Sequence, residues 1–169
     1  MANVTAKIIR SSIEINEVSV SSTKIRNALA EGNVAVANNF LGYPYFLTGT
    51  VVQGRQLGRT IGFPTANIGI KEEYKLIPAI GVYVASATIN GREVPGMMNI
   101  GHNPTVGGEA MSVEIHLFDF DEDIYGASIK VSLHERLRSE IKFESLDALK
   151  KQLAEDKRQA IAYFEKNPL

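Results

Sequence analysis

The sequence predicts a small, mainly β domain followed by one long C-terminal helix. From residue 45 to residue 137 the chain consists of short segments rich in β-branched and aromatic residues, separated by turn-forming residues. Several short strands with turns between them are typical of a β-barrel or a β-sandwich, and periodicity does not choose between the two. Beyond residue 145 the apolar residues recur at spacings of three, four and seven, which indicates an amphipathic helix.

Two of the predicted strands form a hairpin. The segments 81–89 and 92–100 are joined by Asn90-Gly91, the strongest two-residue signal for a hairpin turn. Further strands are predicted at three β-branched or alternating segments: 48–52, 111–118 and 128–134.

The C-terminal helix is predicted to begin after an N-cap at Ser145 and to end at Asn167-Pro168. Asp147 in its first turn complements the positive end of the helix dipole. We expect its apolar stripe to pack on the β core, and docking of a partner helix is the alternative. The stripe consists of Leu146, Leu149, Leu153, Ala160 and Phe164, with Ile161 beside it.

Two short helices are predicted near the N-terminus. The first follows an N-cap at Ser21 or Ser22 and stops at Gly32, and the second covers about 34–41. Asn33 is the expected N-cap of the second helix, which Gly42 and Pro44 end. Strand-like pieces precede them at Ile8-Ile9 and 18–20, and are too short to form a sheet alone.

Composition excludes several classes of protein. The 169 residues fit one domain with a short appendage, and a net charge of −1 gives no general attraction to nucleic acid or to an anionic membrane. The absence of cysteine excludes disulfides and Cys-ligated metal sites. There is no signal-peptide pattern and no apolar run of about 18 residues. We therefore expect a cytoplasmic protein whose partners include neither nucleic acid nor membrane.

The candidate chemistry is concentrated in residues 49–69. Glycines at 54, 58 and 62 let the backbone adopt positive φ or approach a ligand closely, and freed N–H groups can hold phosphate oxygens. Ordinary turn geometry is the alternative, because the spacing matches neither the P-loop nor the dinucleotide fingerprint. Thr65 and Asn67 lie two residues apart, so on extended backbone both side chains leave from one face. A hydroxyl and an amide oxygen suit Mg²⁺ that is also bound to phosphates.

These motifs resemble one known family. Gly-x-Val-Val-x-Gly at 49–54, followed by Gly-Arg-x-x-Gly-Phe-Pro-Thr-Ala-Asn at 58–67, closely resembles the riboflavin kinase module of bacterial bifunctional FAD synthetases. The resemblance implies a six-stranded antiparallel Greek-key barrel over residues 43–169, with a long C-terminal helix. It also implies that the loop covers ATP and that Thr65 and Asn67 hold magnesium. The ATP-binding set that it implies is Gly54, Gly58, Arg59, Gly62, Pro64, Thr65, Asn67 and Asn99.

The same resemblance extends to the N-terminal helices. Ser-Ser-Thr-x-Ile-Arg at 21–26 resembles the end of the adenylyltransferase module of those enzymes, whereas a solvated helix face is the simpler interpretation of Lys24 and Arg26. We expect residues 1–42 to be the remnant of that module and the chain to be part of a longer polypeptide. The adenylyltransferase module is then a covalent partner in the parent protein, and FAD synthesis by this chain is not expected.

Glu114 is the candidate general base. On the strand 111–118 it shares a face with Ser112, His116 and Phe118, and the bare pattern is typical of a solvated carboxylate. The segment Val-Glu-Ile-His at 113–116 resembles the family motif whose Glu is the catalytic base. A Glu114–His116 metal pair is the weaker alternative, and His116 is expected to be a hydrogen-bonded barrel residue. An EF-hand at 119–130 fails because Ile124 and Lys130 stand where Gly and Glu are required, so the acids are expected to form a solvated turn before Tyr125-Gly126.

Two more segments resemble the family. Asn99 begins Asn-Ile-Gly-x-x-Pro-Thr, expected as a loop near the phosphates, with an ordinary Gly/Pro turn as the alternative. Leu-Arg-x-Glu-x-Lys-Phe at 137–143 resembles the segment that folds over the flavin, which implies flavin contacts from Arg138, Glu140 and Phe143, although composition alone suggests surface charges. The expected reaction is Mg-dependent transfer of the ATP γ-phosphate to the ribityl 5′-hydroxyl of riboflavin, giving FMN and ADP. A flavin- or nucleotide-binding barrel without activity is the alternative.

Overall fold

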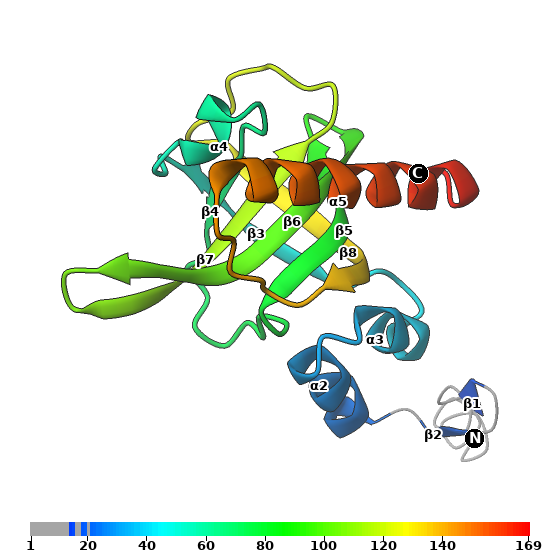
Figure 1. The fold of residues 1–169 in the computed structure, drawn as a ribbon. Helices are drawn as coiled ribbons and strands as arrows, with labels where there is room; N and C mark the ends of the chain where they lie inside the picture. The colour runs from blue at the N-terminus through cyan, green and yellow to red at the C-terminus, as the bar shows by residue number, and fades with distance from the viewer. Residues whose placement is uncertain (1–13, 16–17, 20) are drawn as a thin grey trace, which may run out of the picture.

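The chain forms a closed six-stranded barrel with one long helix on its wall (Figure 1). The structure is a computed structural model that describes residues 14–15, 18–19 and 21–169, so the strand expected at Ile8-Ile9, and Val20, lie outside the described residues. The predicted barrel is confirmed. Its strands are β3 (Phe46–Val52), β4 (Ala66–Gly69), β5 (Gly81–Ile89), β6 (Arg92–Thr105), β7 (Gly108–Leu117) and β8 (Ser128–Arg138).

The barrel is antiparallel throughout, in the order β3-β4-β7-β6-β5-β8, and β8 pairs again with β3. Strands β5, β6 and β7 follow one another, and β8 returns beside β5, which is the Greek-key arrangement. The hairpin predicted at Asn90-Gly91 is present. Both residues have positive φ, 50° and 76°, as a type I′ turn requires.

The inside of the barrel is the main core. In β7 the side chains of Val113, Ile115 and Leu117 are buried in one cluster with residues of the other five strands. Glu114 and His116 therefore face the outside of the wall, because successive side chains of a strand point to opposite faces. The two-face division predicted for this strand is confirmed.

The long helix α5 (Leu146–Lys166) covers part of the outside, over β5, β6 and β8 (Figure 1). Ser145 is its N-cap and accepts a hydrogen bond from the Ala148 amide, as predicted. A second apolar cluster lies under the helix: Phe63, Val84, Met97, Phe118 and Ala160, with Leu153, Tyr163 and Phe164 packed against it. The predicted stripe is wrong at its edges, since Leu146 is 69% exposed and Ile161 is 39% exposed. The first turn extends past the barrel wall and contributes nothing to the cluster.

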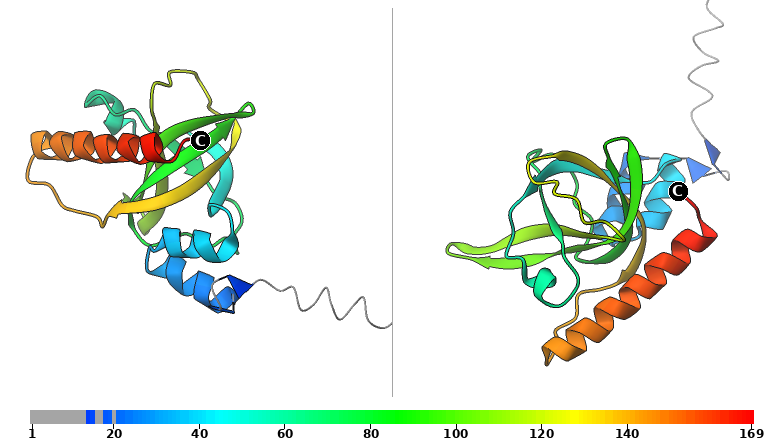
Figure 2. Two further views of the ribbon diagram at one scale, coloured as in Figure 1. Left: turned by 90° about the vertical axis from the view of Figure 1, so that its right-hand side faces the viewer. Right: turned by 90° about the horizontal axis from the view of Figure 1, so that it is seen from above.

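Two helices pack at the end of the barrel that lies opposite the 119–127 loop (Figure 2). α2 (Ser22–Ala30) begins at Ser21, whose hydroxyl accepts from the Lys24 amide, and α3 (Val34–Leu41) ends at Gly42 in left-handed geometry. Asn33 precedes α3 as predicted but makes no side-chain cap bond, and its amide nitrogen donates to Glu31. Four buried residues of these helices belong to the barrel core: Ala28, Leu29, Val34 and Ala37. The division of the chain at residue 42 stays a prediction.

The remaining elements are short. β1 (Glu14–Ile15) pairs with β2 (Val18–Ser19), and the one-turn helix α4 (Leu57–Thr60) lies in the glycine-rich segment. No helix in the described part of the chain is long and apolar enough to cross a lipid bilayer.

The hairpin of β6 and β7 is longer than the sequence predicted and projects from the barrel (Figure 1). Pairing continues from Gly96↔Leu117 to Thr105↔Gly108. The segment 99–105, expected as a loop, is therefore strand. Cross-strand hydrogen bonds with β7 override the turn signals of its Gly and Pro residues, a context effect that local sequence does not reveal.

Candidate active site

Three predicted site residues form a row across the outside of the barrel. Asn67 on β4 pairs directly with Glu114 on β7, and Glu114 pairs directly with Asn99 on β6. Residues directly opposite each other in antiparallel strands point to the same face, with Cβ atoms about 4.5–5.5 Å apart. The structure thus brings the predicted base together with two amide side chains.

Thr65 lies at the edge of this row. Its hydroxyl is 3.4 Å from the Glu114 carboxylate, at the long end of hydrogen-bonding distances. The carbonyl of the preceding Pro64 accepts a 2.7 Å hydrogen bond from Nδ1 of His116, and Phe63 is buried against the same histidine. His116, predicted to be a hydrogen-bonded barrel residue, therefore fixes the backbone from which Thr65 projects.

The three glycines of the loop serve different purposes, and only one fits the expectation of positive φ. Gly62 has φ 85°. A Cβ atom on Gly54 would lie 1.8 Å from Asn67 Nδ2, so the backbone there runs directly over the Asn67 side chain. A Cβ atom on Gly58 would lie 2.1 Å from the carbonyl oxygen of Phe63. The loop is therefore folded tightly onto the row, and two of its glycines are required for close approach.

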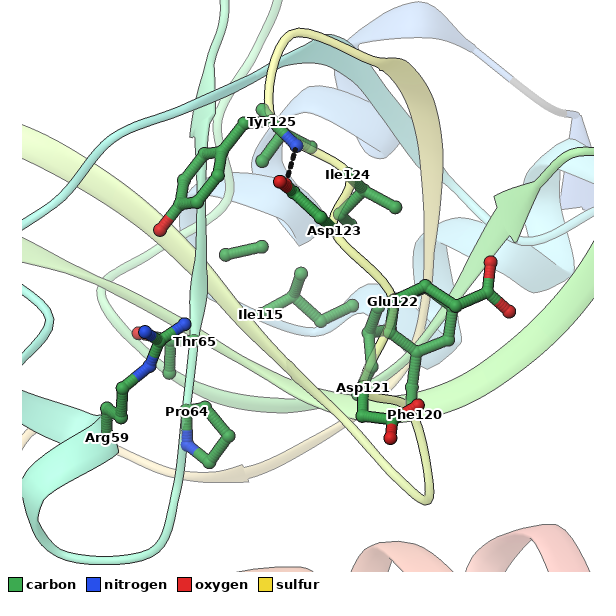
Figure 3. A pocket seen from close by; sticks show the side chains of 13 residues that line it. Arg59, Pro64, Thr65, Ile115, Phe120, Asp121, Glu122, Asp123, Ile124 and Tyr125 are labelled. Carbon is green, nitrogen blue, oxygen red and sulfur yellow. Dashed lines mark hydrogen bonds between the residues drawn. The ribbon is translucent and has the colours of Figure 1, made fainter.

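A cavity of about 540 Å³ opens at the mouth of the barrel next to Thr65 (Figure 3). In Figure 3, Arg59, Pro64, Thr65 and Tyr125 lie on one side of it and the 120–122 segment on the other, with Ile115 between them. The volume is in the range of small-molecule sites. Thr65 both lines this cavity and contacts Glu114, so it joins the cavity to the row of polar residues.

Sequence reasoning did not connect the acidic segment 119–125 with a cavity. It was predicted to be a solvated turn, and Asp121, Glu122 and Asp123 are indeed exposed. The structure shows that the same turn also forms one wall of the cavity, together with Phe120 and Tyr125. In the sequence, only the Tyr-Gly pair that follows the acids pointed to such a role. The walls of a cavity depend on how distant segments of the chain meet.

Of the predicted flavin-side residues, Glu140 lies at the far end of the row. A Cβ atom placed on Gly101 would be 3.2 Å from Glu140 Oε1 and 3.3 Å from Asn99 Nδ2, so Glu140 and Asn99 are close neighbours. The guanidinium of Arg138 lies 5.7 Å from the centre of the Phe143 ring. The structure therefore brings Glu140 next to Asn99, whereas Arg138 is mainly engaged with α5.

The oxygen atoms at Thr65 and Asn67 fit a hard cation better than a transition metal. Among the described residues no group of three His, Asp or Glu could hold a metal ion, and the chain has no cysteine. Mg²⁺ is commonly bound through few protein oxygens, with water and phosphate as the other ligands. A Thr hydroxyl and an Asn amide beside a carboxylate match that pattern.

One buried and one half-buried histidine, His116 and His134, make stability depend on pH. Burial lowers the pKa of His116, and the charge of Lys157 acts in the same direction, whereas the bond to Pro64 opposes it. Nε2 of His116 finds no hydrogen-bond partner among the described residues. Burial also lowers the pKa of His134, whose Nε2 lies 3.0 Å from the Ser86 hydroxyl, with Glu93 acting in the opposite direction.

We expect the free energy of unfolding to decrease as pH falls below about 6.5, because the unfolded chain then binds protons that the folded protein resists. Stability is fully present above that pH. The measurement is the free energy of unfolding in urea at about pH 7.5 and at about pH 5.5. Both pH values lie above the usual carboxyl pKa values. His116→Gln and His134→Gln should each reduce the difference in unfolding free energy between the two pH values. His102→Gln, at an exposed position, should not reduce it. Equal stability of the wild type at both pH values would contradict the expectation.

Fold and site together define a class: a small closed β-barrel with a carboxylate and an oxygen-rich corner on one face of the wall and a cavity at its edge. The family model described as "Flavokinase: Riboflavin kinase" matches residues 41–164. The chain belongs to the riboflavin kinase family.

Curated relatives are longer than this chain. It is 47% identical over 148 residues to the bifunctional riboflavin kinase/FMN adenylyltransferase of Bacillus subtilis, covering 86% of this chain and 46% of that protein. The bifunctional riboflavin kinase/FMN adenylyltransferase of Escherichia coli is 44% identical over 148 residues, covering 87% of this chain and 47% of that protein. The chain spans about half the length of the curated relatives it matches.

Two solved structures are similar. One, described as a macrolide-efflux protein from Streptococcus pneumoniae, has a TM-score of 0.80 and 40% identity, covering 87% of this chain and 48% of that one. The other is a riboflavin kinase from Trypanosoma brucei, with a TM-score of 0.51 and 30% identity, covering 73% of this chain and 81% of that one.

Proposed function

We propose that the chain catalyses Mg-dependent transfer of the γ-phosphate of ATP to the 5′-hydroxyl of riboflavin, giving FMN and ADP. The observation that carries the proposal is the position of Glu114, with its carboxylate 3.4 Å from the Thr65 hydroxyl and its strand neighbours Asn67 and Asn99 on either side. A base beside a phosphate-binding corner is what transfer to an alcohol requires. Family membership supports the choice of riboflavin as that alcohol.

The nucleotide occupies the cavity at the mouth of the barrel and the corner beside it. Apolar side chains of the barrel interior, among them Val51 and Ile115, line the cavity and suit a flat base. Arg59 on the same wall supplies positive charge near the phosphates. Thr65 and Asn67 would hold Mg²⁺, which when bound neutralises charge on the phosphate oxygens. The glycine-rich backbone above Asn67 covers this corner and carries the other expected ATP contacts except Asn99. Asn99 lies on β6, on the far side of Glu114, and we assign it to the flavin side instead.

Riboflavin lies on the other side of Glu114, along Asn99 and Glu140. The Glu114 carboxylate accepts the proton of the 5′-hydroxyl as that oxygen forms a bond to the γ-phosphorus and the bond to the ADP oxygen breaks. The proton then leaves to solvent. General-base catalysis contributes about 10²–10⁴-fold, and alignment of the two substrates supplies most of the remainder. Exclusion of water by the 139–145 segment prevents hydrolysis of ATP.

The test is formation of FMN by the purified chain. With riboflavin, ATP and Mg²⁺ we expect FMN and ADP in equal amounts by chromatography, and no FMN when EDTA removes the metal. We expect no FAD. We infer that the adenylyltransferase module named in the relatives is not among these residues and is joined to them covalently in a longer parent protein. Riboflavin binding without FMN would instead establish the alternative, a flavin-binding barrel without activity. Neither binding nor FMN would overturn the proposal.

A further inference from the structure

The most completely buried charged side chain of the described residues lies outside the row of Glu114. Asp156 of α5 is 1% exposed, and its carboxylate forms a two-pronged ion pair with Arg138 at the end of β8. Nε of Arg138 donates to both carboxylate oxygens at 3.0 Å, and Nη2 donates to one of them at 2.8 Å. Gln152, one turn earlier in α5, adds a hydrogen bond of 2.9 Å to the same carboxylate.

This ion pair limits what Arg138 can do for a ligand. Besides the bonds to Asp156, its Nη1 donates to the Ser139 carbonyl at 3.1 Å, and the Phe143 ring lies 5.7 Å from the guanidinium carbon. Three of its five N–H groups point to the protein. The side chain is also only 15% exposed. Arg138 is therefore built into the protein, and its main contacts are with α5 and with its own loop.

The ion pair connects α5 to the chain segment that lies beside the site. Arg138 directly precedes the irregular segment 139–145, and Asp156 lies in α5, which follows it, so their pairing fixes the start of that segment to the helix. Glu140 of the segment lies beside Asn99, which pairs directly with Glu114. Any movement of Arg138 away from α5 would shift Glu140, because only one residue separates the two. A buried contact on the helix is thus connected to the proposed flavin side of the site.

We propose that Asp156 is a positioning residue for the flavin substrate, which acts through Arg138 to hold the 139–145 segment against Asn99. The inference rests on the proposed function, because it assigns the segment to the riboflavin side. Asp156 touches neither substrate. Its removal therefore weakens riboflavin recognition and leaves the nucleotide corner, on the opposite side of Glu114, unchanged.

The test compares Asp156→Asn with the control variant Glu155→Gln. The control removes the charge of a neighbouring, exposed acid that pairs with Arg158. Asparagine keeps the size of the side chain and its contact with Gln152 but removes the charge. We expect the KM for riboflavin to rise about tenfold, the effect of losing a charged hydrogen bond. The KM for ATP should stay within about twofold of the wild-type value, a change of less than 0.5 kcal/mol. Glu155→Gln should change neither.

Two further measurements separate positioning from a general loss of stability. Trypsin cleavage after Lys142, inside the segment, should be faster in Asp156→Asn than in Glu155→Gln at a temperature where both are folded. Arg138→Gln combined with Asp156→Asn should be no worse than the more severe single variant, since both act through one pair. Equal KM rises for both substrates, unchanged cleavage, or fully additive effects would overturn the inference. The cleavage assay does not depend on turnover, so wild-type protein that forms no FMN would contradict only the proposed function.

Discussion

Replacement of Glu114 by Gln is expected to lower the turnover number for FMN formation at least a hundredfold. Glutamine keeps the size of the side chain and its neighbours Asn67 and Asn99 but accepts no proton. Loss of a general base costs about 10²–10⁴-fold. The affinity for Mg-ATP should change little, because the nucleotide contacts that we infer come from the cavity and from Thr65 and Asn67.

The measurement is the rate of FMN formation at saturating riboflavin and ATP, together with nucleotide affinity by calorimetry. Glu109→Gln is the matched control, since Glu109 lies on the same strand β7 but is exposed near the hairpin tip. It should retain wild-type turnover. If Glu114→Gln turned over within a few-fold of the wild type, Glu114 would not be the base.

The second large effect is expected for Gly54→Ala, which should lower kcat/KM for ATP about a hundredfold. The new Cβ atom would lie 1.8 Å from Nδ2 and 2.4 Å from Cγ of Asn67, far inside contact distance. Either the loop or the Asn67 side chain must move. A displacement of about 1 Å at a reacting centre can cost about 10²-fold. Because the strain is local to the corner, the KM for riboflavin should change much less.

Gly107→Ala provides the control for the same chemical change. A Cβ atom on Gly107 meets nothing within 4 Å among the described residues, and its φ is not in the left-handed range. The two variants should unfold at similar temperatures if the effect of Gly54→Ala is confined to the loop. Identical kcat/KM values for ATP in the two variants would show that the position of Asn67 under the loop does not affect use of ATP.

Much of the fold could be predicted from local sequence. The bounds of α2, α3 and α5 follow from caps at Ser21 and Ser145 and from Gly42, because capping chemistry depends on neighbouring residues only. The Asn90-Gly91 turn likewise determines its hairpin. The closure of the barrel did not follow from periodicity, which is the same for a barrel and a sandwich. It came from the resemblance to the riboflavin kinase family.

The row of Glu114, Thr65 and Asn67 could be predicted in part. Alternation correctly put Glu114 on the face opposite Val113 and Ile115, and the Thr65–Asn67 spacing put both on one face. The two faces coincide because of the register of β4 with β7, whose paired residues Asn67 and Glu114 are 47 residues apart in the chain. No local pattern encodes that register. The roles assigned to these residues remain predictions.

Contacts between distant segments were the features that the sequence did not reveal. Asp156 is one of several charged residues in the sequence of α5, and only the packing of α5 on the barrel shows that it is buried against Arg138. Gly54 was expected to allow positive φ or close approach to a ligand, whereas it provides room for the Asn67 side chain. Both depend on which side chain arrives from elsewhere in the fold.

The most direct test is a crystal structure of the chain with Mg-ADP and riboflavin bound. The account predicts that the Glu114 carboxylate lies within about 2.6–3.2 Å of the ribityl 5′-hydroxyl, with the metal on the oxygens of Thr65 and Asn67. The isoalloxazine ring should lie on the side of Asn99 and Glu140. A ribityl chain that approaches the phosphates from another side, with Glu114 in contact with neither substrate, would contradict it.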